Sequence, residues 1–276
     1  MAAQREVKIQ IDDSFTAKSC NFAVGFLKFE DNGREAAPAG TGTFARVGQT
    51  SGIITAGHVL KNLPDQGEIG LVRFPTIEPA LQNFRLNMAH CDHVLRWNGE
   101  DGSAPDLGFL GIPEVVARDL EAKGAVFYNL TRKREFSTRD KDHVMAKAYA
   151  LVGVVAEWAE VVPGDVTKGL KKIVGGLFGA VKSLKAFVED ETDLLDVEID
   201  YSSSPRIPKS YEGVSGGALW ELHVELLGQK VVEVNTKLHG IAFRQSEDHS
   251  VVTCDTETAI DKLVEDVVAK WNNQAI

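Results

Sequence analysis

A serine enclosed by glycines, in the stretch Gly213-Val214-Ser215-Gly216-Gly217, places the strongest constraint on how this chain can fold. Glycines flank a residue where the backbone needs dihedral angles that a Cβ forbids, or where other atoms approach it closely. A serine held in such a turn exposes its hydroxyl beside backbone N–H groups. Acyl transfer requires both components, a nucleophile and donors for the oxyanion that forms when the nucleophile attacks a carbonyl.

A serine alone is a weak nucleophile, so this interpretation requires a base and an orienting carboxylate elsewhere in the chain. His58 stands in the stretch IITAGHVL, and Asp106 opens the apolar stretch DLGFLGI. In a triad, His58 would act as general base and then as general acid, while Asp106 would fix the tautomer of the imidazole. Simpler interpretations stay open: a half-buried histidine at a strand end, and a strand cap at Asp106, with Asp101 as the fallback carboxylate.

These stretches resemble the T-A-[AG]-H, D-[IL]-[AG]-x-[LI] and G-x-S-G-G motifs of the trypsin/chymotrypsin-like serine peptidases, in the family's order. The resemblance covers about residues 20–272. It implies an all-β fold of two six-stranded antiparallel β-barrels with the active-site cleft between them. It also implies that Ser215 is the nucleophile, and that the N–H groups of Gly213 and Ser215 form the oxyanion hole.

The expected division of the chain is an N-terminal barrel over 1–125, carrying His58 and Asp106, and a C-terminal barrel over 126–276, carrying Ser215. Short apolar stretches separated by turn signals agree with an all-β fold. Apolar residues at helical spacing predict a terminal helix near 256–272 and a helical insertion near 165–188. The insertion has three open interpretations: ordinary packing, a lid or docking element for a regulator, and contact with an acidic membrane surface.

The resemblance also implies a substrate site. An ungapped match places Lys209 at the base of the primary pocket, where it would favour acidic or polar side chains; the alternative is that Lys209 points to solvent. The strand after the nucleophile would bind the substrate backbone as an added β-strand. The implied substrate-binding residues are Lys209, Ser210, Ala242, Phe243, Arg244 and Gln245.

Two departures from the secreted family members bear on regulation and location. Val214 stands where those enzymes carry an aspartate that pairs with a newly cut N-terminus, so we expect no activation by N-terminal cleavage. The three cysteines, Cys20, Cys91 and Cys254, are too few and too scattered for a disulfide framework, which favours a reducing compartment. The first residues do not resemble a signal peptide. We therefore expect a cytoplasmic enzyme of bacterial type.

The charge balance narrows the partners. A net charge of −10 disfavours nucleic acid, because phosphate neutralisation needs clustered lysine and arginine, and a membrane partner is equally unexpected. The stretch His90–His93 invites a metal interpretation, but no second pair of ligands accompanies it, so we expect no metal and no cofactor. The predicted function is a serine endopeptidase acting on protein or peptide substrates. The alternatives are a protease effector that is inactive until a regulatory partner binds, and a catalytically silent binding module.

Overall fold

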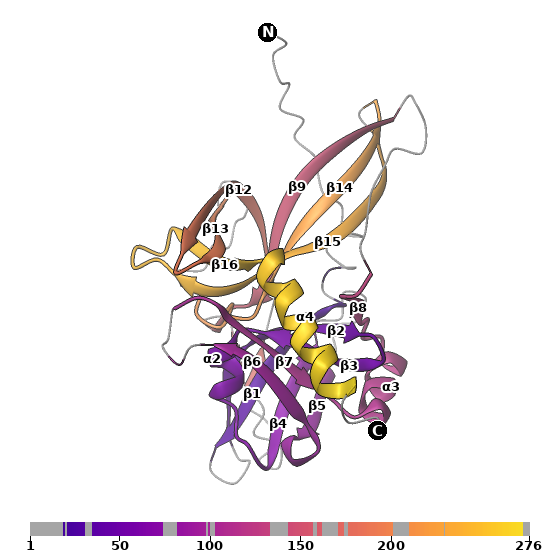
Figure 1. Cartoon of the computed structure of the whole chain (residues 1–276), viewed down its shortest axis with the longest axis vertical. Coiled ribbons are helices and arrows are strands. Elements are labelled where there is room, and N and C mark those ends of the chain that lie inside the picture. The colour runs from indigo at the N-terminus through magenta and orange to yellow at the C-terminus, as the bar shows by residue number, and fades with distance from the viewer. Residues whose placement is uncertain are drawn as a thin grey trace.

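The structure is a computed structural model of the whole chain, and it confirms an all-β architecture of two barrel-like units. Figure 1 shows the two units, with the first sheet below the second barrel. The residues that the structure describes are 19, 21–30, 35–73, 82–97, 99, 103–132, 143–156, 159–161, 171–173, 176–200, 210–228 and 230–272.

The first unit is one strongly curled sheet with the strand order β5-β4-β1-β2-β3-β7-β6, all neighbours antiparallel, and β8 added in parallel to β2. A 3₁₀ turn, Met88–His90, interrupts what would be one long strand and divides it into β5 and β6. This break is why the path holds seven strands where six were expected. Its strands are β1 (Ala23–Glu30), β2 (Glu35–Val47), β3 (Thr50–Thr55), β4 (Glu68–Arg73), β5 (Gln82–Asn87), β6 (Asp92–Trp97), β7 (Asp106–Gly111) and β8 (Tyr128–Asn129).

The second unit is a closed six-stranded barrel in the order β12-β13-β16-β15-β14-β9, as expected. Its long strands β9, β14 and β15 extend beyond the barrel, away from the first sheet (Figure 1). The short pair β10 (Ala159–Val161) and β11 (Lys171–Ile173) stands apart from it. The barrel strands are β9 (His143–Val154), β12 (Gly176–Glu189), β13 (Thr192–Ile199), β14 (Ala218–Leu227), β15 (Lys230–Gln245) and β16 (Val251–Thr256). The first sheet thus ends at residue 129 and the barrel begins at 143, a little beyond the expected boundary at 125.

The helical insertion predicted near 165–188 is wrong, because its second half is the barrel strand β12. The register of β12 against β13 shifts between Val181 and Ser183, which marks a β-bulge. Val181 and Leu184 lie opposite Ile199 and Val197, whose side chains are both buried in the barrel. The bulge therefore changes the inward spacing from two residues to three. A three-residue spacing imitates a helix, so the periodicity was misleading here.

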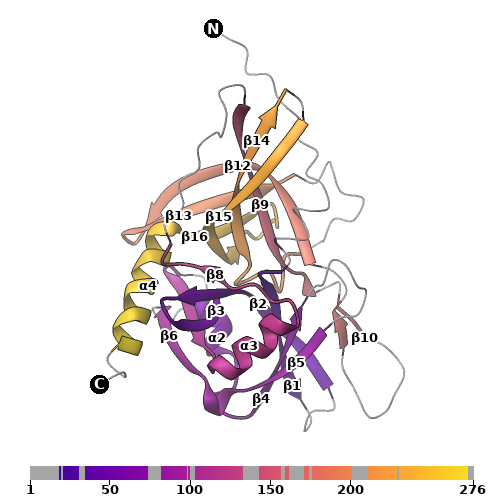
Figure 2. The ribbon, with the colours of Figure 1, turned by 90° about the vertical axis from the view of Figure 1, so that its right-hand side faces the viewer.

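The terminal helix predicted near 256–272 is confirmed as α4 (Glu257–Asn272). Figures 1 and 2 show α4 running from the second barrel down along the first sheet. Ion pairs fasten it there, Arg96 to Asp266 at 2.6 Å and Lys270 to Asp92 at 2.5 Å. The short α2 (Gly57–Lys61) carries His58, and α3 (Glu114–Ala122) packs against β3. Within the described ranges, no helix has the length and apolar character needed to cross a membrane.

An aromatic cluster fixes the two units against each other. The Trp220 side chain on β14 is 1% exposed, and its ring lies 5.1 Å from the rings of both Phe22 and Tyr128, which belong to the first unit. The Tyr128 hydroxyl also accepts a hydrogen bond from the backbone N–H of Leu238 at 3.2 Å. Large rings buried in this way contribute several kcal/mol to the interface. The two units therefore meet through a packed aromatic contact.

Candidate active site

Asp106 holds His58 by two hydrogen bonds. Its Oδ1 accepts the backbone N–H of His58 at 2.8 Å, and its Oδ2 lies 2.6 Å from the imidazole Nδ1. Asp106 opens β7 and is fully buried, whereas the His58 side chain on α2 is 20% exposed. An ionised carboxylate only accepts, so Nδ1 carries the proton that it receives. The imidazole Nε2 is then the nitrogen left to take a proton from another group.

Gly57 allows this close arrangement. A Cβ at Gly57 would lie 2.9 Å from Asp106 Oδ1 and 2.8 Å from the Cβ of Trp97. Such contacts are shorter than real Cβ atoms tolerate, so the carboxylate reaches the start of α2 because Gly57 has no side chain. The glycine of the Thr55–His58 motif therefore has a steric role.

A second buried carboxylate, Asp255 on β16, lies behind the first. Its Oδ2 accepts the backbone N–H of Asp106 at 3.0 Å. Burial raises the pKa of Asp255 to about 7, and the neighbouring charge of Asp106 raises it further, against the lowering effects of this hydrogen bond and of Arg244. Asp255 stands in no motif and is distant in sequence from the other site residues, so no sequence signal points to it.

The serine turn docks on the first unit beside the histidine motif. Gly213 and Gly216 adopt φ values of +90° and +86°, which favour glycine. A Cβ at Gly216 would lie 1.9 Å from the Thr41 carbonyl oxygen and 2.0 Å from Thr55 Oγ1. Thr41 donates its backbone N–H to the Ser215 carbonyl at 2.8 Å. Thr55 ends β3 and lies three residues before His58. The contacts of Gly216 with Thr55 therefore place the serine turn next to the histidine motif.

Two N–H groups of the turn stay unused. Val214, Gly216 and Gly217 all donate their N–H groups to backbone carbonyls at 2.6–2.9 Å. Gly213 and Ser215 donate theirs to no other residue in the described part of the chain. The Ala156 N–H donates to the Glu212 carbonyl at 2.7 Å and so orients the peptide that carries the Gly213 N–H. The Thr41 hydroxyl holds the next peptide, because it donates to the Gly213 carbonyl at 2.7 Å. A paired donor site of this kind suits a developing negative charge on oxygen.

The Ser215 hydroxyl does not contact the imidazole in this structure. It donates to the carbonyl oxygen of Phe243 at a long 3.5 Å, and no hydrogen bond joins it to His58. The structure thus pairs His58 with Asp106 and places the serine turn beside them, without closing the last hydrogen bond of a triad. Catalytic hydrogen bonds often tighten only when substrate binds.

Val214 anchors the turn by apolar packing. Its side chain is 1% exposed and lies in the interior cluster of the second barrel with Tyr211 and Leu219. Tyr211 is held in turn, because its backbone N–H donates to Gln245 Oε1 at 3.1 Å. A buried valine at this position fixes the turn without any ion pair.

The implied substrate-binding residues take different positions. Lys209, like the fallback carboxylate Asp101, lies outside the described residues. The Ser210 hydroxyl accepts the N–H of Glu212 at 3.0 Å, which occupies it in the turn. The side chains of Ala242 and Phe243 are 1% and 3% exposed, so these two residues contribute mainly backbone to the site.

Arg244 presents a charged side chain next to this backbone. Its guanidinium forms two hydrogen bonds to the Glu189 carboxylate, at 3.1 and 2.6 Å, and lies over the Phe243 ring. The pair with Glu189 raises the pKa of Arg244 and lowers the pKa of Glu189. Arg244 therefore remains a cation, paired with an anion at the end of β12.

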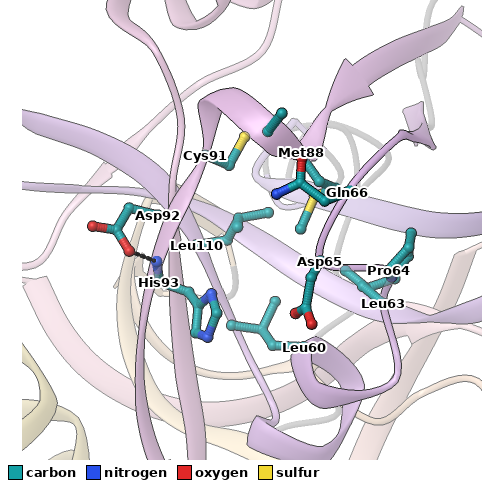
Figure 3. A pocket seen from close by; sticks show the side chains of 11 residues that line it. Leu60, Leu63, Pro64, Asp65, Gln66, Met88, Cys91, Asp92, His93 and Leu110 are labelled. Atoms are coloured by element: carbon teal, nitrogen blue, oxygen red, sulfur yellow. Dashed lines mark hydrogen bonds between the residues drawn. The ribbon is translucent and has the colours of Figure 1, made fainter.

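The stretch His90–His93 has a different environment. Cys91 and His93 line a cavity of about 160 Å³ together with Leu60 of α2 and Met88 (Figure 3). Burial raises the pKa of the Cys91 thiol to about 11, and Asp92 pairs with Lys270. Among the described residues, no three metal-ligating side chains form a possible metal site.

Comparisons with known proteins add little. No family model and no curated protein matches the sequence. The chain is similar to a solved structure described as "Aromatic interactions drive the coupled folding and binding of the intrinsically disordered Sesbania mosaic virus VPg protein", at a TM-score of 0.37 and 13% identity. The match covers 86% of this chain and 87% of that chain. A likeness at this level carries no functional inference.

Proposed function

We propose that this protein is a serine endopeptidase that cleaves proteins or peptides through an acyl-enzyme on Ser215. One observation carries the proposal: the buried Asp106 carboxylate holds both the backbone and the Nδ1 of His58, at 2.8 and 2.6 Å. The serine turn, docked on the strand that leads to His58, supplies the nucleophile. A buried carboxylate paired with a partly exposed imidazole is an arrangement that functional sites favour.

The reaction follows from these positions. The Ser215 hydroxyl rotates away from the Phe243 carbonyl, gives its proton to His58 Nε2 and bonds to the substrate carbonyl carbon. The resulting oxyanion accepts the N–H groups of Gly213 and Ser215, each worth roughly 3–4 kcal/mol of transition-state stabilisation. His58 then returns the proton to the leaving amine as the C–N bond breaks. Water hydrolyses the acyl-enzyme by the same proton transfers in reverse.

A fluorophosphonate tests the proposal directly, because it phosphonylates only an activated serine and releases fluoride. We expect one adduct by intact-mass measurement on the wild-type protein and none on Ser215→Ala. Ser250→Ala is the control, since it removes an exposed serine hydroxyl that donates to Asp248 at 2.7 Å, and it should retain the adduct. A folded wild-type protein that gains no adduct would contradict an active isolated enzyme.

The resting position of the Ser215 hydroxyl favours a second candidate, a protease that is completed by a regulatory partner. This candidate predicts no adduct on the purified protein and a serine-specific adduct once the partner is added from a native extract. The region 165–188 is no detachable lid in this scheme, because it contains β12 of the barrel.

The free state of Cys91 and Cys254 supports a reducing compartment, such as the cytoplasm, as the place of action.

A further inference from the structure

Asp255 connects the second barrel to the catalytic dyad. It stands on β16, is fully buried, and accepts the Asp106 N–H with its Oδ2 at 3.0 Å. Its other oxygen, Oδ1, is buried and has no hydrogen-bond partner among the described residues. Two carboxyl groups therefore share one buried region, and only one of them, Asp106, contacts the imidazole. A buried carboxyl oxygen without a hydrogen-bond partner is costly, so a role for the Asp255 side chain is expected.

Few charges offset this pair. Arg244 on β15 faces Asp255, but its guanidinium already binds Glu189 of β12. From β13, Asp196 accepts the Thr253 hydroxyl at 2.9 Å and adds negative charge nearby. On β16 itself, burial raises the pKa of the Cys254 thiol, which stays neutral. At the start of α4, Glu257 is paired with Lys237 at 2.6 Å.

We propose that Asp255 is a positioning residue that holds the backbone of Asp106 and, by gaining or losing its own proton, sets the number of negative charges behind His58. The inference rests on the proposed peptidase function. With the proton bound, Asp106 is the sole anion that stabilises the imidazolium formed during catalysis. When the proton leaves to solvent, a second buried anion adds to that stabilisation. Activity should then rise with pH through a step near neutrality that belongs to Asp255.

Two substitutions separate the two roles. Asp255→Asn keeps an oxygen for the Asp106 N–H and cannot ionise. We expect its rate of fluorophosphonate labelling to equal that of the wild type below pH 6 and to be about three- to tenfold lower at pH 8.5. Asp255→Ala removes the acceptor and should label at least about tenfold more slowly at every pH, because the Asp106 N–H is left without a partner.

Asp196→Asn is the matched control, since it removes the same charge from the neighbouring strand without contact to Asp106. Its pH profile should follow that of the wild type. A pH profile for Asp255→Asn that superimposes on the wild-type profile would overturn the proposed charge effect. Equal labelling of Asp255→Ala and wild type would overturn the positioning role.

Carboxyl-carbon NMR tests the inference independently of catalysis. In the Ser215→Ala protein with ¹³C-labelled aspartate, we expect one carboxyl resonance to titrate with a midpoint near 7 and to be absent from the Asp255→Asn spectrum. Hydrogen exchange of the Asp106 amide should accelerate in Asp255→Ala and not in Asp255→Asn. These measurements remain decisive even if labelling shows that the peptidase proposal has failed. No resonance titrating between pH 6 and 8 would overturn the inference.

Discussion

The two halves of the candidate site are held by different kinds of interaction. The first unit fixes His58 by short polar contacts within one sheet, because α2 and β7 adjoin and Asp106 is buried between them. The second barrel fixes Ser215 by glycine dihedrals, by the buried Val214 and by contacts that cross to Thr41 of the other unit. The side chain of His58 is therefore held directly by its own unit, with Asp255 of the second barrel acting only through the Asp106 backbone, whereas the position of Ser215 depends on how the two units meet.

Asp106→Asn should disrupt the polar contacts that hold His58, and we expect it to have the largest effect on activity. The amide can present its NH₂ group to Nδ1 and select the wrong tautomer, so we expect labelling of Ser215 to fall about 10⁴-fold. Asp92→Asn is the control, because Asp92 lies on the adjacent strand β6, is exposed, and pairs with Lys270 of α4. Labelling rates for the two variants give the comparison. A loss below about tenfold in Asp106→Asn would show that this carboxylate does not orient the base.

Gly216→Ala tests the glycine-dependent half. The new Cβ would meet the Thr41 carbonyl at 1.9 Å and would also carry the strain of a positive φ. We expect a loss of about 4 kcal/mol of unfolding free energy and no detectable labelling. Gly67→Ala isolates the strain, since Gly67 has a φ of +94° and nothing within 4 Å of the added Cβ. Thermal unfolding of both variants measures the difference, and equal losses would contradict the close docking of the turn.

Thr41→Val tests how the contacts of the Thr41 hydroxyl with the second barrel affect the serine turn. The hydroxyl donates to the Gly213 carbonyl at 2.7 Å and accepts the Val154 N–H at 2.8 Å, and valine leaves both groups without this partner. We expect a cost of about 2 kcal/mol and labelling about tenfold slower, because the peptide between Gly213 and Val214, which links the two unused donors, loses its orientation. Thr43→Val, at a buried threonine on the same strand, controls for the general cost of the substitution. If both variants label at the same rate, Thr41 does not orient the turn.

Sequence patterns anticipated part of this arrangement. The terminal helix followed from its periodicity, whereas the contact between His58 and Asp106 was expected from the resemblance of two short motifs to those of a known family. The strand β12 was missed because its inward spacing is set by a bulge against β13, and Asp255 was missed because only the tertiary fold brings it to Asp106. Both errors come from contacts between distant segments, which residue periodicity does not record.

Glu189→Gln should have the smallest effect of these substitutions. It tests the part of the second barrel around Arg244, next to Ser215. It weakens the pair between Glu189 and Arg244, which are both partly exposed, so the unfolding free energy should fall by about 0.5 kcal/mol or less. With less of its charge offset by Glu189, the Arg244 guanidinium beside Phe243 should then attract acidic groups, and we expect a few-fold gain in the relative cleavage of peptides with acidic residues before the scissile bond. Glu198→Gln, which removes the exposed pair with Lys182 on the same hairpin, is the control and should leave the preference unchanged. Substrate profiling of both variants makes the comparison. An unchanged preference in Glu189→Gln would place Arg244 away from the bound substrate and restrict the contribution of this strand to its backbone.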